Sequence, residues 1–337
     1  MQKRFPYPTL FLTHSGTGAL EMIADLLDIS EGDEIILPSY TFVSSVNAFA
    51  SKGAIPVFVD IEKETWNISV SEVEKAISSK TKAVIAVHYG GHTCEMHQLK
   101  AICEKHSLAL IEDAAMGYGS FFETQPLGSI GDFGIISFDI TKQISAIQGG
   151  LLLVNNEKYK NRAENIYHIG TNRTQFTLGK SPYYEWVDVG SKYQMNELNA
   201  AVLFEQLQQE ESLLERRKQI SLRYYEQLSP LAQKGSFGLM PAHLVKNNIH
   251  VFYILTNSLK ERQELSDYLE LHKIESFFHY IPLHSSSFGL KKGRKIGDLQ
   301  NTELVSNCLL RLPLHAELTN EEVNYVCLKI RDFYNGK

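Results

Sequence analysis

Two short apolar runs, Ala83-Val-Ile-Ala-Val-His88 and Leu108-Ala-Leu-Ile-Glu-Asp113, flank a stretch with helical spacing over Met96–His106. Continuous apolar runs that are rich in β-branched and aliphatic residues are typical of strands buried on both faces. Two such strands joined by a helix form a crossover unit in which the strands run parallel. This stretch therefore predicts an α/β fold with a mainly parallel sheet.

The same alternation fills the first half of the 337-residue chain. Further strands are expected at residues 34–37, 55–60, 134–138 and 150–155. Further helices are expected at residues 17–28, 42–52 and 71–78. Because ligands gather where the strands of such a sheet end and its helices begin, functional residues are expected at these junctions.

The pattern changes after residue 156. Residues 168–193 are polar, aromatic and glycine-containing, which predicts a functional or interface loop. A long helix is expected over about residues 196–228, then strands such as 250–255 and helices at 259–272 and 320–334. The chain length favours two domains, and we predict a large α/β domain over residues 1–210 and a smaller α+β domain over residues 211–337.

Composition and charge exclude several classes of protein. Hydrophobic residues make up 43% and charged residues 21%, which is typical of a globular chain and not of a disordered one. The net charge of −6 and the absence of runs of five like charges argue against a nucleic-acid partner or a membrane anchor. Four cysteines without C-x-x-C spacing suggest neither a metal site nor a disulfide framework. Without a long apolar span or an apolar signal core, we expect a cytoplasmic protein.

The segment Thr13-His-Ser-Gly-Thr17-Gly-Ala opens a predicted helix. Free N–H groups at a helix N-terminus bind anions, and small residues let a phosphate approach closely. The alternative is an ordinary helix cap, because Ser, Thr and Gly are also common cap residues. The segment is not a Walker loop, since no lysine follows the glycines.

Two polar residues follow predicted strands. Asp113 ends one apolar run, where it is either a turn residue or a carboxylate that faces the crevice above the sheet. Lys142 follows the run 134–138 and is close in sequence to Gln148-Gly-Gly. A lysine in this position is either exposed to solvent or desolvated, and a desolvated amine is a nucleophile toward carbonyl groups.

Taken together and in this order, these signals match the needs of pyridoxal phosphate. The cofactor requires a phosphate-binding site, an aromatic side chain that stacks on its ring, a carboxylate for its ring nitrogen and a lysine that forms a Schiff base. The helix start at Thr17, the aromatic Phe42, Asp113 and Lys142 supply one group for each need. We therefore predict a pyridoxal 5'-phosphate enzyme.

The motifs also resemble those of a known family, the sugar-nucleotide aminotransferases of the DegT/DnrJ type. The resemblance runs from about Leu10 to the C-terminus and implies the aspartate-aminotransferase-like fold, which is pyridoxal-phosphate fold type I. The motifs that carry it are Ser15-Gly-Thr17-Gly-Ala-Leu-Glu, Pro38-Ser-Tyr-Thr-Phe42-Val-Ser-Ser, Val87-His-Tyr-Gly-Gly, Glu112-Asp113-Ala-Ala, Ser137-Phe-x-x-x-Lys142 and Gln148-Gly-Gly.

This resemblance implies a role for each matching residue. Lys142 would form the Schiff base and shuttle the proton during transfer, and Asp113 would keep the ring nitrogen protonated. Met116 would lie beside the phenolic oxygen of the cofactor. The ring face and the phosphate would be held by Phe42, Thr17, the Gly18 backbone and Ser137. Residues 190–194, with Gln194, would reach the phosphate of the other subunit, which implies a homodimer with shared active sites.

Further motifs resemble the branch of this family that makes dTDP-4-amino-4,6-dideoxygalactose. They are Gly170-Thr-Asn-Arg173-Thr-Gln-Phe, Trp186-Val-Asp-Val-Gly190-Ser, His250-Val-Phe-Tyr and Phe278-His-Tyr-Ile-Pro-Leu-His284. The implied reaction transfers the amino group of L-glutamate to the C4 keto group of dTDP-4-dehydro-6-deoxyglucose. Its product would serve surface polysaccharides such as lipopolysaccharide and enterobacterial common antigen. Arg173 would meet a substrate phosphate or carboxylate, or would be an exposed loop arginine.

The sequence departs from the family pattern in a few places. The family's leading segment is expected to be absent or reduced to residues 1–9, Met116 replaces a hydrogen-bonding side chain, and Gln148 replaces a glutamate in a loop that is one residue shorter. These departures favour a second hypothesis, an inactive relative that acts as a binding or regulatory protein. A sugar dehydratase would need histidine in place of Lys142. His88 and His284 are expected to make structural hydrogen bonds or sugar contacts instead of binding a metal.

Overall fold

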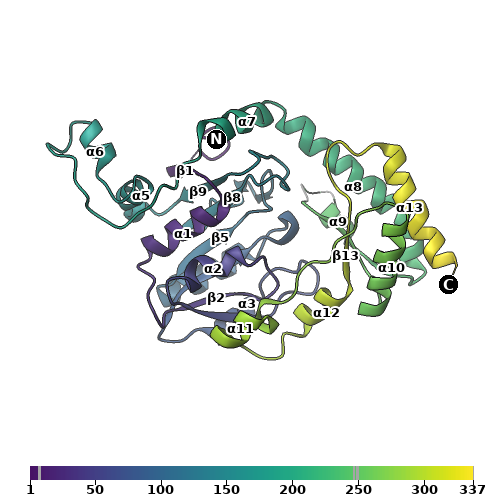
Figure 1. The fold of residues 1–337 in the computed structure, drawn as a ribbon. Helices are drawn as coiled ribbons and strands as arrows, with labels where there is room; N and C mark the ends of the chain where they lie inside the picture. The colour runs from purple at the N-terminus through teal and green to yellow at the C-terminus, as the bar shows by residue number, and fades with distance from the viewer. Residues whose placement is uncertain (7–8, 246, 248–249, 337) are drawn as a thin grey trace.

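The computed structural model describes residues 1–6, 9–245, 247 and 250–336. An eight-stranded sheet forms the centre of the molecule (Figure 1). Its strands, in spatial order, are β1 Thr9–Thr13, β9 Gly150–Val154, β8 Phe133–Ser137, β5 Ala109–Asp113, β4 Thr81–Val87, β2 Glu34–Pro38, β3 Ile55–Val59 and β12 Arg294–Lys295. Strand β9 runs antiparallel to β8 and β1, whereas β8, β5, β4, β2, β3 and β12 pair in parallel. The predicted parallel sheet is confirmed.

Helices cover both faces of this sheet. Helices α1 Gly16–Leu26, α2 Ser44–Ala50 and α5 Lys160–Tyr167 share one apolar core with the sheet. Helices α3 Val70–Ala76, α4 Met96–His106 and α7 Glu197–Gln208 share the core on the other face. Successive strand residues enter opposite cores: Leu152 lies in the first, and Leu151 and Leu153 lie in the second. Burial on both faces explains why these strands are apolar throughout.

The first strand, β1, is not among the expected strands. It covers Thr9–Thr13 and pairs antiparallel with β9, where Thr13 lies opposite Gly150. It lies outside the predicted alternation of strands and helices, and its partner β9 lies far along the chain, so no local pattern marks it. The helix α1 follows almost directly, so β1 and β9 hold the start of α1 against the sheet.

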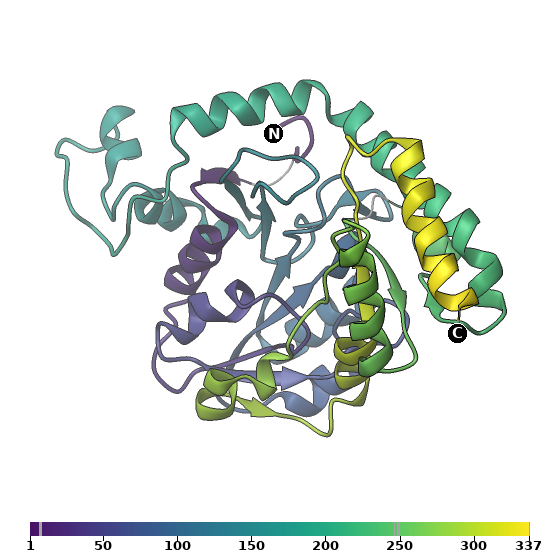
Figure 2. The ribbon, with the colours of Figure 1, turned by 45° about the vertical axis from the view of Figure 1, so that its right-hand side comes forward.

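A second, three-stranded sheet forms in the C-terminal part, with the order β10 Gly238–Leu239, β11 Phe252–Leu255 and β13 Leu309–Leu312. Helices α8 Glu210–Gln233, α10 Leu259–Leu271 and α13 Asn320–Asn335 pack around it, as Figure 2 shows from the side. A capping box between Thr319 and Glu322 begins α13. The expected helices and strand of the smaller domain are therefore present.

The expected single helix over residues 196–228 is wrong. Two helices, α7 and α8, meet at Gln209, whose backbone has φ −108° and ψ 9°. The oxygen of Gln209 accepts hydrogen bonds from the Leu213 N–H and from the Ser212 hydroxyl, which begin the new helix. The apolar spacing of the two helices is similar, so periodicity alone did not reveal the break.

Part of the C-terminal region returns to the large sheet. Helices α11 Ser287–Lys292 and α12 Gln300–Cys308 flank β12, which pairs with β3. The Asp60 carboxylate, just after β3, accepts hydrogen bonds from the N–H groups of Asn301 and Thr302. The two halves of the chain are thus interleaved, and the boundary after residue 210 stays a prediction.

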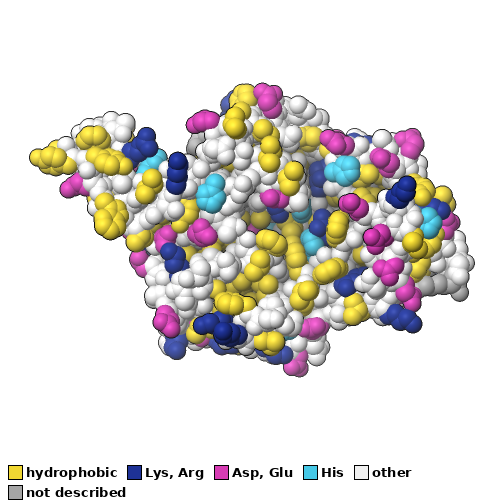
Figure 3. All heavy atoms as spheres, in the orientation of Figure 1, with side chains coloured by type: hydrophobic (Ala, Val, Ile, Leu, Met, Phe, Trp, Pro, Cys, Tyr) yellow, Lys and Arg dark blue, Asp and Glu magenta, His cyan; other side chains and the backbone are white. Residues whose placement is uncertain are grey.

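Residues 168–193 form an arm that projects from the large sheet (Figure 1, left). The arm contains α6 Arg173–Thr177, and its two sides meet at bridges between His168 and Lys192 and between Thr171 and Trp186. Figure 3 shows apolar side chains gathered on it, and the exposed ones include Phe176, Leu178, Tyr183, Tyr184, Trp186 and Val189. So much exposed apolar surface is typical of an interaction surface.

The remaining short elements connect these layers. They are η1 Tyr89–Gly91, β6 Phe121–Phe122, β7 Gln125–Pro126, η2 Glu157–Tyr159, α9 Ala242–Val245 and η3 Leu283–Ser285. No helix within the described residues is both long enough and apolar enough to cross a membrane.

Candidate active site

A cavity of about 700 Å³ opens at the carboxyl ends of β4, β5 and β8, which is where the strand pattern predicts a site. The β13 strand and residues 277–280 of the C-terminal part form the opposite wall. Of the predicted site residues, six line this cavity: Thr17, Phe42, Asp113, Met116, Ser137 and Lys142. Gly18 and Gln194 are not among the lining residues.

Asp113 presents its carboxylate to this cavity from the last position of β5. One oxygen accepts a hydrogen bond of 2.6 Å from the Ser45 hydroxyl, and the other accepts a bond of 3.1 Å from the Ala115 N–H. The side chain is almost fully buried, so these two donors keep it oriented and help to stabilise its charge. Asp113 therefore faces the crevice, and its bond to the Ala115 N–H also closes the turn after β5.

The neighbouring Glu112 faces the opposite side of the sheet and is fully buried. Its carboxylate accepts four hydrogen bonds. The N–H groups of Ile130 and Gly131 donate at 2.6 and 2.7 Å, the Gly128 N–H donates at 2.9 Å, and Nε2 of His88 lies at 3.0 Å. Glu112 thus holds the connection between β7 and β8. Of the two adjacent acids, Glu112 is structural and Asp113 faces the cavity.

Lys142 lies in the loop after β8. The Asp139 oxygen accepts a hydrogen bond of 3.0 Å from the Lys142 N–H, and the Asp139 carboxylate accepts bonds from the N–H and hydroxyl of Thr141. Burial lowers the pKa of the Lys142 amine, and the Arg311 charge lowers it further, against the opposing effects of Asp113 and Asp139. An amine with a lowered pKa that faces a cavity is suited to attack a carbonyl group.

The start of α1 forms the end of the cavity near Ser137. Ser15 caps the helix by accepting a hydrogen bond of 3.0 Å from the Gly18 N–H, and the expected phosphate contact of the Gly18 backbone stays a prediction. The N–H groups of Gly16 and Thr17 remain in the first turn, which has no intrahelical partners for them. A side chain at Gly16 would contact Ser137, since its Cβ would lie 3.4 Å from that of Ser137. The helix start and Ser137 together can hold a phosphate.

Phe42 and Met116 form apolar parts of the wall. Phe42 is 57% exposed, and its ring centre lies 6.4 Å from that of Tyr280. The Met116 sulfur accepts a hydrogen bond of 3.3 Å from the Gly90 N–H. Since a thioether has no hydrogen to donate, Met116 supplies only an acceptor and apolar surface at this position.

Gln194 lies at the base of the arm, outside the cavity of its own chain. Its amide donates to the Tyr167 oxygen at 2.5 Å and lies 3.2 Å from Nδ1 of His168. The fold of one chain therefore does not bring Gln194 to the other site residues.

Several lining residues come from the C-terminal part, and none of them was predicted as a site residue, although the motifs quoted above contain His250, His279 and Tyr280. These lining residues are His250, Phe277, His279, Tyr280 and Arg311. The signal that could have pointed to Arg311 is that it is a single charged residue in the apolar run Leu309–Leu312. Ser45 also lines the cavity, and only its position within the Phe42 motif pointed to it.

The two histidines for which structural bonds were expected do make them. Nδ1 of His88 accepts a hydrogen bond from the Cys94 N–H, so Nε2 carries the proton that is donated to Glu112. His284 bonds to Ser39 at 2.7 Å and to Glu303 at 3.0 Å. Within the described residues, no group of three His, Cys, Asp or Glu side chains is arranged to hold a metal ion.

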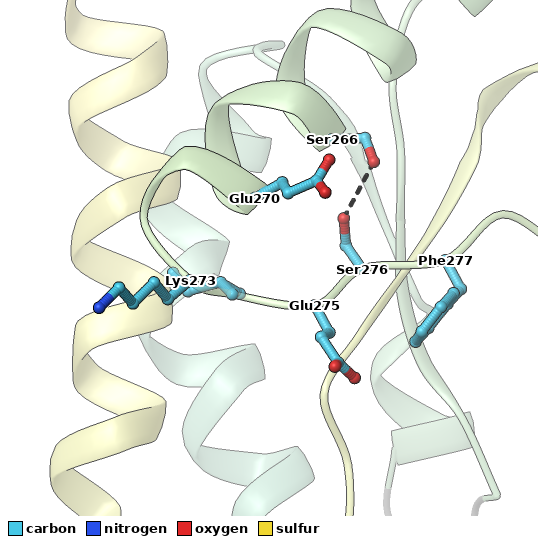
Figure 4. A pocket seen from close by; sticks show the side chains of 7 residues that line it. Ser266, Glu270, Lys273, Glu275, Ser276 and Phe277 are labelled. Atoms are coloured by element: carbon cyan, nitrogen blue, oxygen red, sulfur yellow. Dashed lines mark hydrogen bonds between the residues drawn. The ribbon is translucent and has the colours of Figure 1, made fainter.

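A second hollow, of about 550 Å³, lies on the surface of the C-terminal part (Figure 4). Ser266 and Ser276 share a hydrogen bond of 3.3 Å across it, and Lys273 extends away from it (Figure 4). None of the predicted site residues lines this hollow. The chemical groups that the sequence singles out are therefore concentrated in the first cavity.

Comparison with known proteins shows the family to which the chain belongs. The model of the DegT/DnrJ/EryC1/StrS aminotransferase family matches residues 11–331. An uncharacterized protein, MJ1066 of Methanocaldococcus jannaschii, is 35% identical over 92% of this chain and 82% of its own length. GDP-perosamine synthase of Escherichia coli O157:H7 is 33% identical over 96% of this chain and 85% of its own length. A pleiotropic regulatory protein of Geobacillus stearothermophilus is 31% identical over 95% of this chain and 83% of its own length.

Solved structures show the same fold. The sugar aminotransferase Spr1654 of Streptococcus pneumoniae, in its PMP form, is 27% identical to this chain and has a TM-score of 0.89. The match covers 99% of this chain and 90% of Spr1654, and a PLP form of that protein matches with a TM-score of 0.88. TlmJ of Streptoalloteichus hindustanus is 26% identical, with a TM-score of 0.88 and with 97% and 86% covered. The fold is thus aspartate-aminotransferase-like, as expected, and the chain belongs to the DegT/DnrJ/EryC1/StrS aminotransferase family, whose enzymes depend on pyridoxal phosphate.

Proposed function

We propose that this chain transfers the amino group of L-glutamate to the C4 keto group of dTDP-4-dehydro-6-deoxyglucose, with Lys142 as the covalent residue. The product is dTDP-4-amino-4,6-dideoxygalactose. One observation carries the proposal: Lys142, Asp113 and the start of α1 line a single cavity, in which the Asp113 charge acts on the Lys142 amine.

The residues of this cavity fit pyridoxal phosphate. The N–H groups of Gly16 and Thr17 and the Ser137 hydroxyl would hold its phosphate. The Asp113 carboxylate would hold the proton on its ring nitrogen, and Phe42 would cover a face of the ring. When bound, the cofactor supplies a ring that withdraws electrons from the carbon bearing the amine.

Lys142 has two tasks in this proposal. Its Nζ would hold the cofactor covalently, which requires the uncharged amine, and the lowered pKa increases the uncharged fraction. Once the amino donor has replaced it, the same Nζ would accept the proton from the amine-bearing carbon of the donor and would deliver it to the C4′ carbon of the cofactor.

We further propose a homodimer with shared active sites. The arm exposes Tyr183 at 70% and Trp186 at 80%, and a second copy would cover this apolar surface. Gln194 at the base of the arm would then lie near the phosphate end of the partner's cavity. The predicted reach of residues 190–194 motivates this arrangement.

The identity of the nucleotide on the sugar substrate is the most specific part of the proposal. Four motifs in residues 170–284 resemble the dTDP-sugar branch, whereas one of the similar relatives is a GDP-perosamine synthase. Both point to amination of an activated deoxysugar. We favour the dTDP-linked sugar because the resemblance includes motifs around the cavity, such as those containing His250 and His279.

The first experiment tests the covalent residue. Purified protein that has been loaded with pyridoxal phosphate and freed of excess cofactor should show a visible absorption band, and borohydride should reduce the C=N bond to Lys142 so that the cofactor stays attached. Lys142→Ala should lose both signals while keeping its circular-dichroism spectrum. A wild-type protein that stays colourless with added cofactor would overturn the proposed chemistry.

The second experiment tests the substrate. The holoenzyme and L-glutamate are incubated with dTDP-4-dehydro-6-deoxyglucose or with a GDP-linked 4-keto-6-deoxyhexose, and products are identified by mass. A gain of an amino group on the dTDP sugar at the higher kcat/KM supports the proposal. Preference for the GDP sugar would refute the choice of nucleotide and keep the aminotransferase.

A second candidate function is a regulatory protein that keeps the fold without turnover. Met116 and Gln148 favour it, since neither supplies the side chain usual at these family positions, and one similar relative is a pleiotropic regulatory protein. In that case the Lys142 adduct would form, but no amino group would move to either sugar. The two experiments together separate the candidates.

A further inference from the structure

We propose that two adjacent serines at the start of α2 hold the cofactor at two points: Ser44 donates a hydrogen bond to the phosphate, and Ser45 positions the Asp113 carboxylate for the ring nitrogen. The inference deepens the proposed function and rests on its placement of the cofactor. It makes Ser44 a further binding residue and Ser45 a positioning residue.

Helix α2 brings both hydroxyl groups to the cavity. Ser44 and Ser45 are its first two residues, and both line the cavity. The buried Val46 and Phe49 place the helix in the same apolar core as α1, and the Ser45 N–H donates to the Phe42 oxygen at 3.1 Å. The two serines therefore belong to a backbone that close packing holds against α1.

The Ser45 hydroxyl is part of a chain of hydrogen bonds that ends at Asp113. It is buried, and its Oγ lies 2.6 Å from a carboxylate oxygen of Asp113 and 2.8 Å from Oγ1 of Thr41, which is also buried. A hydroxyl has one hydrogen to donate, and an ionised carboxylate can only accept. Ser45 therefore donates to Asp113, and Thr41 donates to Ser45. Such a chain polarises the Ser45 hydroxyl and holds the carboxylate in one orientation.

Ser44 lies beside the start of α1, where the phosphate is expected. Its Oγ accepts a hydrogen bond of 2.9 Å from the Thr17 hydroxyl, which is in the first turn of α1. This bond uses the one hydrogen of the Thr17 hydroxyl, so that hydroxyl does not donate to an anion while the bond is made. The Ser44 hydroxyl hydrogen has no acceptor among the residues that the structure describes. Of these two hydroxyls, Ser44 is thus the one that is left to donate to a phosphate.

The connectivity of the cofactor explains how neighbouring residues serve both groups. In pyridoxal phosphate a single ring carbon separates the ring nitrogen from the carbon that carries the phosphate arm, whereas the aldehyde is attached opposite the nitrogen. The nitrogen and the phosphate arm therefore share one edge of the ring. Ser45 contacts the carboxylate for the nitrogen and Ser44 contacts the helix start for the phosphate, so one helix start serves this edge.

A purely structural role is the alternative, because hydroxyls near a helix start commonly cap backbone N–H groups. Neither serine does so here. The N-cap residue of α2 is Val43, which makes no capping bond with its side chain. The partners of the two serine hydroxyls are Thr17, Thr41 and Asp113, and all three line the cavity. The network therefore faces the cavity and does not cap the helix.

The experiment measures the affinity of the apo-protein for three ligands that form no covalent bond to Lys142. They are pyridoxamine phosphate, pyridoxamine, which lacks the phosphate, and an analogue of pyridoxamine phosphate in which a C–H group replaces the ring nitrogen. Ser45→Ala should weaken the binding of pyridoxamine phosphate by on the order of 10-fold and leave the C–H analogue within about 2-fold of the wild type. Ser44→Ala should weaken the binding of pyridoxamine phosphate by on the order of 10-fold and leave pyridoxamine within about 2-fold.

Two further variants separate hydrogen bonding from packing. Ser45→Cys fills a similar volume but supplies only a weak donor, so it should bind like Ser45→Ala. Ser44→Thr keeps the hydroxyl and should bind pyridoxamine phosphate within about 3-fold of the wild type. Ser51→Ala, at the exposed far end of α2, is the matched control and should bind all three ligands like the wild type.

The pattern across the ligands decides the role of each serine. Equal losses for all three ligands in an alanine variant would assign that serine a structural role, and unchanged affinity for pyridoxamine phosphate would exclude its part in the site. Either result overturns the inference for that serine. A wild-type apo-protein that binds pyridoxamine phosphate no more tightly than the other two ligands would contradict the proposed placement of the cofactor itself, and the wild-type measurement alone identifies this outcome.

Discussion

Replacing Glu112 with glutamine should destabilise the protein strongly, although the side chain keeps its shape. The Glu112 carboxylate is fully buried and accepts four hydrogen bonds, from the N–H groups of Gly128, Ile130 and Gly131 and from His88. Glutamine keeps one acceptor oxygen and places an NH2 group against two of these donors. Each hydrogen bond to a charged group contributes about 1.5–3 kcal/mol, so losing two predicts a cost of about 3–6 kcal/mol.

This cost is large against the 5–15 kcal/mol that is usual for the unfolding of a domain. Urea unfolding at fixed protein and cofactor concentrations measures it, and amide hydrogen exchange should show faster opening at residues 128–131. Glu104→Gln, an exposed position on α4, is the control and should change the free energy of unfolding by less than about 0.5 kcal/mol. A loss below about 1 kcal/mol for Glu112→Gln, with unchanged exchange at residues 128–131, would refute the reasoning.

Three further predictions follow from other parts of the chain. In Gly150→Ala the new Cβ would lie 2.4 Å from the Ser15 backbone carbon, so the substitution should lower the free energy of unfolding by about 1–3 kcal/mol and weaken cofactor binding. The control is Gly179→Ala, whose Cβ would have nothing within 4 Å. It should lower the free energy of unfolding by only about 1–2 kcal/mol, because of its φ of +70°, and leave cofactor binding unchanged. Because burial lowers the pKa of Lys142 below 10.5, the rate at which the apo-protein forms the cofactor adduct should rise with pH and level off below pH 10.5, and a rate still rising beyond that pH would contradict the lowered pKa. Trp186→Asp should weaken the proposed dimer by at least about 10-fold in sedimentation velocity without changing the circular-dichroism spectrum, and an unchanged dimer affinity would place the interface elsewhere.

Much of the large sheet could be predicted because its signals are local. The apolar runs that end at Asp113 and precede Lys142 became β5 and β8, and helix α4 has the predicted bounds Met96–His106. Hydrophobic periodicity and helix-start residues lie in contiguous stretches of sequence, so they can be recognised without knowledge of the fold. The same approach missed β1, because that strand depends on pairing with β9 more than 100 residues away.

Some functional residues could likewise be predicted from the sequence, and others could not. Resemblance and residue type were enough to single out Lys142 and Asp113, which do line one cavity. The phosphate role predicted for the Gly18 backbone stays a prediction, and the folded chain shows that the Ser15 hydroxyl accepts a hydrogen bond from the same N–H. Arg311 and His279 could not be assigned from sequence, since they are more than 130 residues from Lys142 along the chain and meet it only across the cavity.

By itself, the order of residues determined which stretches become strands and helices and which chemical groups stand at their ends. The folded chain decided which of two adjacent acids, Glu112 or Asp113, faces the cavity and which arginine lies beside the reactive amine. It also lowered the pKa of Lys142, since removal of water and the approach of Arg311 act through space. Short-range geometry follows the chain from residue to residue, whereas desolvation and electrostatic interactions depend on distances that only tertiary packing sets.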